Sequence, residues 1–237
     1  MDLKNGDCLD LMKELDDNSV DLLFADLPYG QTKAKWDSLI DLELFWKEAN
    51  RVCKADTPMV FTCTVKFGNT LINSNPKNFR YDLVWVKSSS TGFLFSKKAP
   101  LRKHEMIYIF YNKLPKIYTE NIALHHPYKL LNSKNGMKGQ DDLLYGKSVK
   151  QVQNKKYDPP LPNSILEIKS EKGKHSTQKP VKLMEWVLKY YSKEGDIVLD
   201  PTMGSGSMGV ACKNQNRLFI GIEKDETIYK VAVERCA

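Results

Sequence analysis

The sequence predicts an α/β fold built around a mixed, mostly parallel sheet that helices cover on both faces. Three observations lead to this prediction. Short apolar runs typical of buried strands alternate with segments of helical periodicity. One of these runs leads through a glycine-rich turn into a helical segment. The chain has 237 residues, of which 41% are hydrophobic and 27% are charged, and a single core can be built at this size.

Most of the alternating pattern lies in the N-terminal part of the chain, before Asn112. Within residues 81–87, the alternation predicts that Leu83, Trp85 and Lys87 point outward, against Val84 and Val86. The elements expected in this part are helices over residues 7–15 and 42–53 and strands over residues 20–25, 58–63, 81–87 and 106–111.

The stretch 112–174 departs from this pattern. Between Asn112 and Lys172 there are 11 lysines, no arginine and six acids, a local net charge of +5 within the overall +7. Gly, Asn, Ser and Pro interrupt it repeatedly, so we expect an inserted lobe of irregular structure. The α/β pattern then resumes, with helices expected over residues 180–192 and 207–214 and strands over residues 196–199 and 218–222.

Composition restricts the partners and the compartment. The charge surplus favours a polyanionic partner, although many basic proteins bind no nucleic acid. The five cysteines are scattered without a CxxC pair, so we expect buried thiols and no zinc site or disulfide framework. No run approaches the roughly 18 apolar residues of a membrane helix, and the N-terminus contains acids and does not resemble a signal peptide. These features predict a cytoplasmic protein without membrane contact.

The glycine-rich turn has the spacing of a nucleotide-type cofactor loop. Gly204, Gly206 and Gly209 form a GxGxxG pattern between an expected strand and an expected helix. Glu223 ends the next expected strand after this loop, where a carboxylate can bind ribose hydroxyls. The pattern therefore predicts cofactor binding, with a purely structural turn as the alternative.

Two further features favour S-adenosylmethionine over NAD, although both cofactors contain adenosine. Asp200 precedes Gly204 by four positions, where its carboxylate would attract the methionine ammonium and repel a pyrophosphate. Glu223 lies close to the last residue, Ala237, so the remaining strands are expected from the N-terminal part of the chain. We therefore expect a circularly permuted order, which disfavours an NAD-dependent oxidoreductase.

The segment Asp26-Leu27-Pro28-Tyr29 follows an expected buried strand, at the edge of the sheet where α/β proteins bind ligands. The Asp26 carboxylate and the backbone carbonyl of Leu27 or Pro28 can accept both N–H bonds of an exocyclic base amine. This localises the nitrogen lone pair and stabilises the positive charge that develops during methylation. Tyr29 offers a ring on which an extruded base can stack. The alternative is a plain turn.

With both loops identified, the chain resembles the amino methyltransferases of DNA, in their permuted beta group. Asp26–Tyr29 is similar to the family's (Asp/Asn)-Pro-Pro-Tyr motif, with Leu27 where proline is usual. The other matching segments, in the family's order, are Gly6-Asp7-Cys8, Trp85-x-Lys87, His104-Glu105, His175-Ser176-Thr177-Gln178-Lys179-Pro180, the loop from Asp200 to Ser207, and Glu223.

This resemblance implies a Rossmann-like, S-adenosylmethionine-dependent methyltransferase fold in permuted order. Residues 1–111 would form the catalytic half, 112–174 the target recognition lobe and 175–237 the cofactor-binding half. Aspartate at position 26 favours adenine N6, since serine there is the usual mark of cytosine N4 enzymes. The catalytic residues implied are Asp26, Leu27, Pro28 and Tyr29. The cofactor-binding residues implied are Asp7, Cys8, Asp26, His175, Thr177, Gln178, Lys179, Asp200, Thr202, Gly204, Ser205, Gly206 and Glu223.

The resemblance also implies double-stranded DNA as the substrate. Lys97, Lys98, Arg102 and Lys103 lie in a segment without acids, interleaved with aromatic residues, and we expect them to contact phosphates. A solvated, flexible charged loop is the alternative. Methylation of cytosine N4, of RNA or of protein, and a non-catalytic DNA-binding role, remain open. Dimers occur in this family, and a cognate restriction endonuclease can accompany its members without direct contact.

Overall fold

The computed structural model describes residues 1–30, 39–118, 162–171 and 178–237. The chain divides into two compact units, one formed by residues 1–118 and 163–237 and the other by residues 119–162. Most of the expected recognition lobe lies outside the described residues, as do His175 and Thr177. The division at residues 112–174 therefore stays a prediction, and the description below concerns the larger unit.

The described residues form an eight-stranded mixed sheet in the order β1-β8-β7-β2-β3-β5-β4-β6. Neighbours from β1 to β3 run parallel, β5 is antiparallel to both β3 and β4, and β6 runs parallel to β4. This confirms the expected mixed, mostly parallel sheet. The strands are β1 Asp2–Asn5, β2 Leu22–Ala25, β3 Met59–Cys63, β4 Phe79–Thr91, β5 Arg102–Phe110, β6 Ile165–Glu167, β7 Ile197–Asp200 and β8 Leu218–Glu223.

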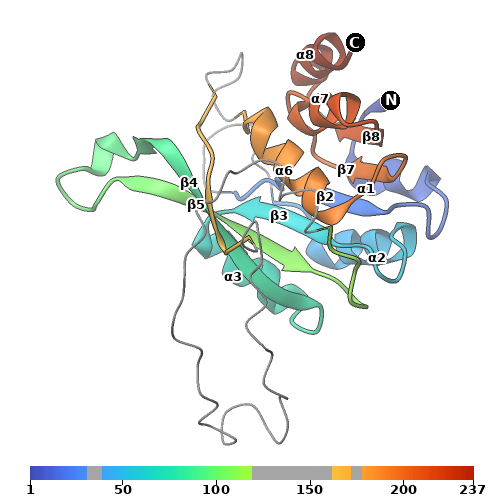
Figure 1. Ribbon diagram of the computed structural model, residues 1–237, viewed down its shortest axis with the longest axis horizontal. Helices are drawn as coiled ribbons and strands as arrows, with labels where there is room; N and C mark the ends of the chain where they lie inside the picture. Colours follow the sequence, from blue (N-terminus) through green and yellow to red (C-terminus); the bar gives the residue numbers. More distant parts are fainter. Residues whose placement is uncertain (31–38, 119–161, 172–177) are drawn as a thin grey trace, which may run out of the picture. The chain divides into compact units, whose positions relative to one another are not determined.

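The permuted order is visible in the sheet, because β7 and β8 from the end of the sequence lie between β1 and β2 from its beginning (Figure 1). Leu22 pairs with Val198, and Asp2 pairs with Ile220. The sequence pattern did not predict β1, a short strand in which Leu3 is the one apolar residue and no residue is fully buried. Nor did it predict β6, which is too short for a periodicity to show.

Helices cover both faces of the sheet, as expected. One hydrophobic core lies under α1, α2 and α3, and a second lies under α6, α7 and α8. The expected helix over residues 7–15 is a short α-helix followed by a 3₁₀ turn, Met12–Glu14. The α-helices are α1 Cys8–Leu11, α2 Leu42–Val52, α3 Val65–Ser74, α6 Val181–Tyr191, α7 Ser207–Asn214 and α8 Glu226–Cys236.

Helix α3 was absent from the sequence-based prediction. Threonine is a preferred residue at helix N-termini, and Thr64 caps α3: its hydroxyl accepts a hydrogen bond from Phe67 N at 3.3 Å. Gly68 and Asn69 interrupt the helical periodicity near its middle. Gly68 is required by packing, because a Cβ there would lie 2.3 Å from the Tyr108 ring.

The strand over residues 81–87 is present, but the predicted direction of its side chains was wrong. Leu83, Trp85 and Lys87 form its buried side, whereas Val84 and Val86 are only half-buried. Leu83 and Trp85 belong to the second core, which α6 covers. Alternation identifies the two faces of a strand, but only packing decides which face is covered.

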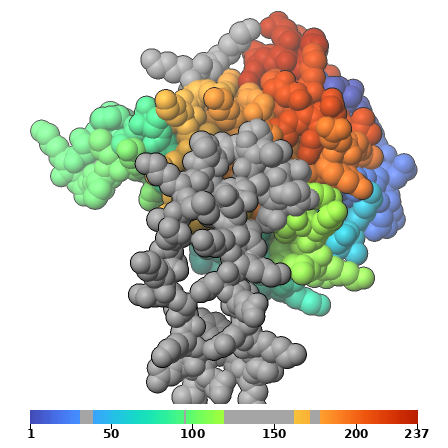
Figure 2. All heavy atoms as spheres, in the orientation of Figure 1, coloured from blue at the N-terminus to red at the C-terminus, as the bar shows by residue number. Residues whose placement is uncertain are grey.

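Strands β4 and β5 extend beyond the expected ends and form a hairpin that projects from the sheet (Figures 1 and 2, green). Phe93 and Leu94 lie at its tip and are 67% and 97% exposed. All five cysteines are buried and free, which confirms the expectation of buried thiols. In the described ranges, no helix is long and apolar enough to cross a membrane.

Candidate active site

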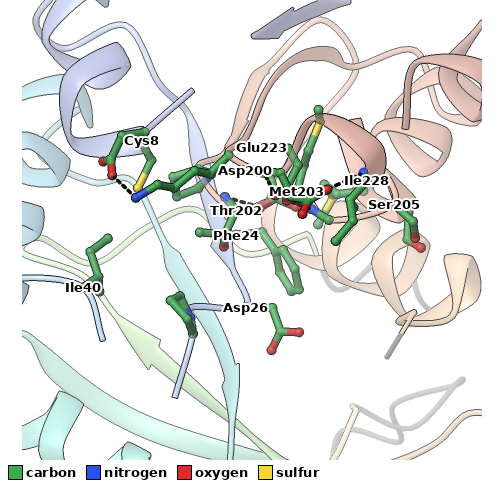
Figure 3. Close-up of a pocket in the computed structure, with 18 of the residues that line it drawn as sticks. Cys8, Phe24, Asp26, Ile40, Asp200, Thr202, Met203, Ser205, Glu223 and Ile228 are labelled. Carbon is green, nitrogen blue, oxygen red and sulfur yellow. Dashed lines mark hydrogen bonds and ion pairs between the residues drawn. The ribbon is translucent and has the colours of Figure 1, made fainter. Parts of the chain in front are cut away.

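A cavity of about 460 Å³ opens at the carboxyl ends of β2, β7 and β8, within the size range of small-molecule sites (Figure 3). Its wall combines the segment after β1, the loop after β2, the glycine loop after β7 and the residues before α6. The residues expected at the site that line it are Asp7, Cys8, Asp26, Pro28, Gln178, Lys179, Asp200, Thr202, Gly204, Ser205 and Glu223. Leu27, Tyr29 and Gly206 were expected there too but do not line the cavity.

The glycine loop begins where β7 ends, at Asp200. Gly204 and Gly206 both have left-handed backbone conformations, with φ of 52° and 79°, which glycine adopts without steric cost. A Cβ at Gly206 would lie 3.0 Å from Cys236 Sγ and 3.3 Å from the backbone of Ala232. Apart from its chain neighbours, a Cβ at Gly204 would have no other heavy atom within 4 Å among the described residues. Gly206 therefore allows α8 to pack on the loop, while Gly204 leaves room at the cavity.

Glu223 is held in place by backbone groups. Its Oε2 accepts a hydrogen bond from Gly204 N at 3.0 Å, and its Oε1 accepts one from Asp225 N at 2.8 Å. Burial raises the pKa of Glu223, although these two hydrogen bonds oppose that effect. The carboxylate therefore lies in a defined orientation at the wall of the cavity.

Asp200 is a buried carboxyl group, 3% exposed, at the start of the glycine loop. Its Oδ1 accepts a hydrogen bond from Thr202 N at 3.1 Å. Burial raises its pKa well above the usual range, and the negative charges of Asp26 and Glu223 add to this effect. Among the described residues, the buried Thr202 hydroxyl has no hydrogen-bond partner. A cationic or polar ligand in the cavity would satisfy both groups.

Asp26 follows β2 and accepts hydrogen bonds from three side chains. Its Oδ1 accepts from the Tyr29 hydroxyl and from Thr62 Oγ1 at 2.8 Å, and its Oδ2 contacts Lys179 Nζ. Burial and the Asp26 charge raise the pKa of Tyr29, so this hydroxyl is a neutral donor. The Tyr29 ring packs against Phe67, with centroids 5.3 Å apart. Stacking of a base on Tyr29 stays a prediction.

The side chain of Leu27 points away from the cavity. It is 2% exposed and belongs to the core under α1, α2 and α3. Only the backbone of this residue can therefore serve a ligand. This explains why leucine fits at a position where the resembled motif usually has proline.

The loop before α6 brings Lys179 to the same carboxylate. Lys179 Nζ pairs with Asp26 and lies 3.6 Å from Glu105 Oε2, and Glu105 Oε1 lies 3.0 Å from Lys87 Nζ. Burial lowers the pKa of Lys179, but the two carboxylates outweigh burial and raise it. Glu105 and Lys87 belong to the matching segments named above, but the motifs did not assign them to the site. Through Lys179 their contacts join the β4–β5 hairpin to the loop before α6, which is distant in the sequence, so no local motif reveals them.

The four expected DNA contacts lie on the β4–β5 hairpin and not at the cavity. Lys97, Lys98, Arg102 and Lys103 are all exposed, on or beside the strands that lead to the tip. No acid occurs between Lys87 and His104. The hairpin is therefore an exposed basic surface with apolar side chains at its end.

Comparison with known proteins relates this geometry to one family. A family model described as DNA methylase matches residues 20–234. The type II methyltransferase M.HpaI of Haemophilus parainfluenzae is 28% identical over 94% of this chain and 70% of its own length. M.HinfI of Haemophilus influenzae, also a type II methyltransferase, is 27% identical over 97% of this chain and 66% of its own length.

Solved structures share the same fold. The M1.HpyAVI–SAM complex matches with a TM-score of 0.65 at 23% identity, over 99% of this chain and 98% of that chain. The PvuII DNA methyltransferase, named as cytosine-N4-specific, matches with a TM-score of 0.72 at 16% identity, over 99% of this chain and 86% of that chain. At these identities, both likenesses concern the fold.

Proposed function

Because this chain belongs to the DNA methylase family, we propose that it transfers a methyl group from S-adenosylmethionine to the N6 amine of an adenine flipped out of double-stranded DNA. The observation that carries the proposal is a single cavity lined by Asp26 from the catalytic loop and by Asp200 and Glu223 around the glycine loop (Figure 3). A methyl donor and an amine held at these residues would meet in one space.

The residues of the cavity fit S-adenosylmethionine. Asp200 is a buried carboxylate that would pair with the methionine ammonium, and Glu223 is oriented to accept ribose hydroxyls. The unpartnered Thr202 hydroxyl would gain a hydrogen bond. Asp7 and Cys8 line the same cavity and would lie near the adenine ring. When bound, the sulfonium supplies an activated methyl group: a nitrogen–carbon bond forms as the carbon–sulfur bond breaks.

The catalytic loop would hold the target amine. Asp26 and the carbonyl of Leu27 or Pro28 would accept its two N–H bonds, which directs the nitrogen lone pair toward the methyl group. The amine then releases one proton to water. Aspartate at position 26 favours adenine over cytosine, although the PvuII enzyme shows that the same fold serves cytosine N4.

Mass spectrometry of nucleosides tests the proposal. Unmethylated double-stranded DNA would be incubated with the protein and S-adenosylmethionine, then digested. We expect N6-methyladenine. N4-methylcytosine would retain the fold and mechanism but contradict the assignment of adenine from Asp26. Methylation of RNA or protein alone, in parallel incubations, would contradict the DNA substrate. The homodimer and the accompanying endonuclease remain predictions of the resemblance, and the cytoplasmic location remains a prediction from the composition.

Replacing Asp200 by Asn should affect cofactor binding and stability in opposite directions. The ammonium would pair with the ionised carboxylate. Burial, Asp26 and Glu223 raise the pKa of Asp200 in the free protein, and the hydrogen bond from Thr202 N and the charge of Lys179 oppose them. Cofactor affinity should therefore rise with pH through that pKa and then level off. Asp200→Asn should weaken binding and abolish this pH dependence. Because a raised carboxyl pKa destabilises the fold above the unfolded-state pKa, the variant should have a higher Tm at neutral pH.

Isothermal titration calorimetry in buffers of different ionisation enthalpy measures this effect. Wild-type protein should release a proton on binding S-adenosylmethionine near the raised pKa, and the Asn variant should release none. Asp82→Asn, at an exposed position on β4, is the control. Equal proton release by wild type and Asp200→Asn would contradict the role of Asp200.

Removing the lysine charges of the β4–β5 hairpin should weaken binding to DNA of any base sequence. Each phosphate contact contributes a slope of about −0.9 to the dependence of log K on log salt concentration. Replacing Lys97, Lys98 and Lys103 by Ala should reduce the magnitude of that slope by about 2–3. Fluorescence anisotropy with labelled duplexes at several salt concentrations measures it. The control replaces the exposed lysines 13, 47 and 230, outside the hairpin, and an equal change there would refute a specific role for the hairpin.

A further inference from the structure

A second carboxylate, that of Glu105, shares Lys179 with Asp26. Glu105 belongs to β5, Lys87 to β4, and Lys179 to the loop before α6. Trp85 lies opposite Glu105 in the strand register, so Lys87, two positions further on, shares a face with Glu105. Glu105 Oε1 lies 3.0 Å from Lys87 Nζ, and Oε2 lies 3.6 Å from Lys179 Nζ.

The four groups form a charge-balanced row with little exposure to water. Two ammonium groups alternate with two carboxylates in the order Lys87, Glu105, Lys179, Asp26. The side chains of Lys87 and Lys179 are 8% and 12% exposed, and those of Glu105 and Asp26 are 25% and 26% exposed. Because these side chains are largely buried, each charge is stabilised by the opposite charges beside it. Removal of one charge therefore changes the ion pairs of its neighbours.

The Asp26 carboxylate already accepts hydrogen bonds from three side chains. A carboxylate has about four positions for hydrogen-bond donors, and the hydroxyls of Tyr29 and Thr62 and the Lys179 ammonium already donate to it. A base amine must compete with these donors. Lys179 also has a second carboxylate within ion-pair distance, because Glu105 Oε2 lies 3.6 Å from its Nζ.

We propose that Glu105 is a positioning residue for methyl transfer: it receives the Lys179 ammonium as the target amine engages Asp26, while Lys87 holds Glu105 in place. This inference rests on the proposed role of Asp26 as the acceptor of the amine. Glu105 does not touch the base or the cofactor in this role. Glu105 weakens the ion pair between Lys179 and Asp26, so that the Asp26 carboxylate can accept a hydrogen bond from the target amine.

Removing the charge of Glu105 tests the proposal. In Glu105→Gln, Lys179 has Asp26 as its remaining carboxylate partner in the row, so the carboxylate is less free to bind the amine. We expect the single-turnover rate, at saturating cofactor and DNA, to fall about 10–100-fold, as for other losses of transition-state positioning. Affinity for S-adenosylmethionine should change less than threefold. Glu48→Gln, which alters a buried ion pair with Arg51 outside the cavity, is the matched control and should keep the wild-type rate.

A double variant separates positioning from charge balance. Glu105→Gln alone leaves Lys87 buried without its carboxylate, which by itself destabilises the fold. Lys87→Met combined with Glu105→Gln removes both charges and should restore Tm without restoring the rate. Recovery of the wild-type rate in the double variant would show that Glu105 serves only to balance Lys87, and would overturn the proposal.

A second double variant tests the route through Lys179. If Glu105 acts through this lysine, Glu105→Gln should add less than a twofold loss of rate in a Lys179→Met background. Multiplicative losses would overturn the proposal. Asp26→Ala in the same assay separates the two levels of inference. An active Asp26→Ala would refute the proposed role of Asp26 and this inference together. An inactive Asp26→Ala with a wild-type rate for Glu105→Gln would refute the inference alone.

Discussion

Replacing Asp26 by Ala should abolish methyl transfer and leave S-adenosylmethionine binding nearly unchanged. The variant loses the carboxylate that would accept the amine N–H and stabilise the charge that develops on nitrogen. Loss of one such preorganised contact reduces the rate about 10²–10³-fold, which is roughly 2.7–4 kcal/mol of transition-state stabilisation. The fold should tolerate the change, because Lys179 keeps Glu105 as a partner at 3.6 Å.

Single-turnover transfer of labelled methyl groups to duplex DNA measures the rate, and calorimetry measures cofactor binding. Asp82→Asn, on the exposed side of β4, is the matched control and should keep the wild-type rate. An Asp26 variant that retained more than about a tenth of the rate, a loss under ~1.4 kcal/mol, would refute the catalytic assignment. Loss of cofactor binding in step with activity would show that Asp26 serves the cofactor and not the amine.

Replacing Gly206 by Ala should destabilise the protein more than the same change at Gly195. Both glycines have left-handed backbones, with φ of 79° and 81°, so both alanines incur the same conformational cost of about 1–2 kcal/mol. At Gly206 the new Cβ would also press on Cys236 Sγ at 3.0 Å and the Ala232 backbone at 3.3 Å. Overpacking of this kind costs a further ~1–3 kcal/mol. Open space surrounds Gly195.

Urea denaturation of the two variants measures the difference in free energy of unfolding. We expect Gly206→Ala to be less stable than Gly195→Ala by at least about 1 kcal/mol. Gly206→Ala should also bind S-adenosylmethionine more weakly, because displacement of α8 moves the glycine loop. Equal stabilities would mean that α8 shifts without cost and that the tight packing at Gly206 is not required for the fold.

Local pattern was sufficient for the main elements and for most of the cavity. Buried strands appear as apolar runs because both of their faces are covered, so β2, β3, β7 and β8 were predicted close to their observed bounds. The loops that follow parallel strands meet at one edge of the sheet. Asp26, Asp200 and Glu223 could therefore be placed at a common site from the sequence, and all three line the cavity.

Other features depend on partners that the sequence pattern does not identify. Strand β1 owes its existence to pairing with β8 at the other end of the chain, where Asp2 pairs with Ile220. The alternation in β4 was visible, but the core beneath α6 determined that Leu83, Trp85 and Lys87 face inward. Propensity and periodicity are local, whereas pairing and burial depend on the elements that surround a segment.

The sequence by itself determined the α/β class, the permuted order of strands, the glycine loop and the acids at its borders, because each rests on residues close together in the chain or on the order of such segments. Only the tertiary structure decided which carboxylates share a lysine. Lys179 reaches Asp26 across 153 positions, and Lys87 reaches Glu105 across 18, through two antiparallel strands. Ion pairs of this kind require side chains from separate elements to lie close together, and that proximity arises only when the sheet and its covering helices have assembled.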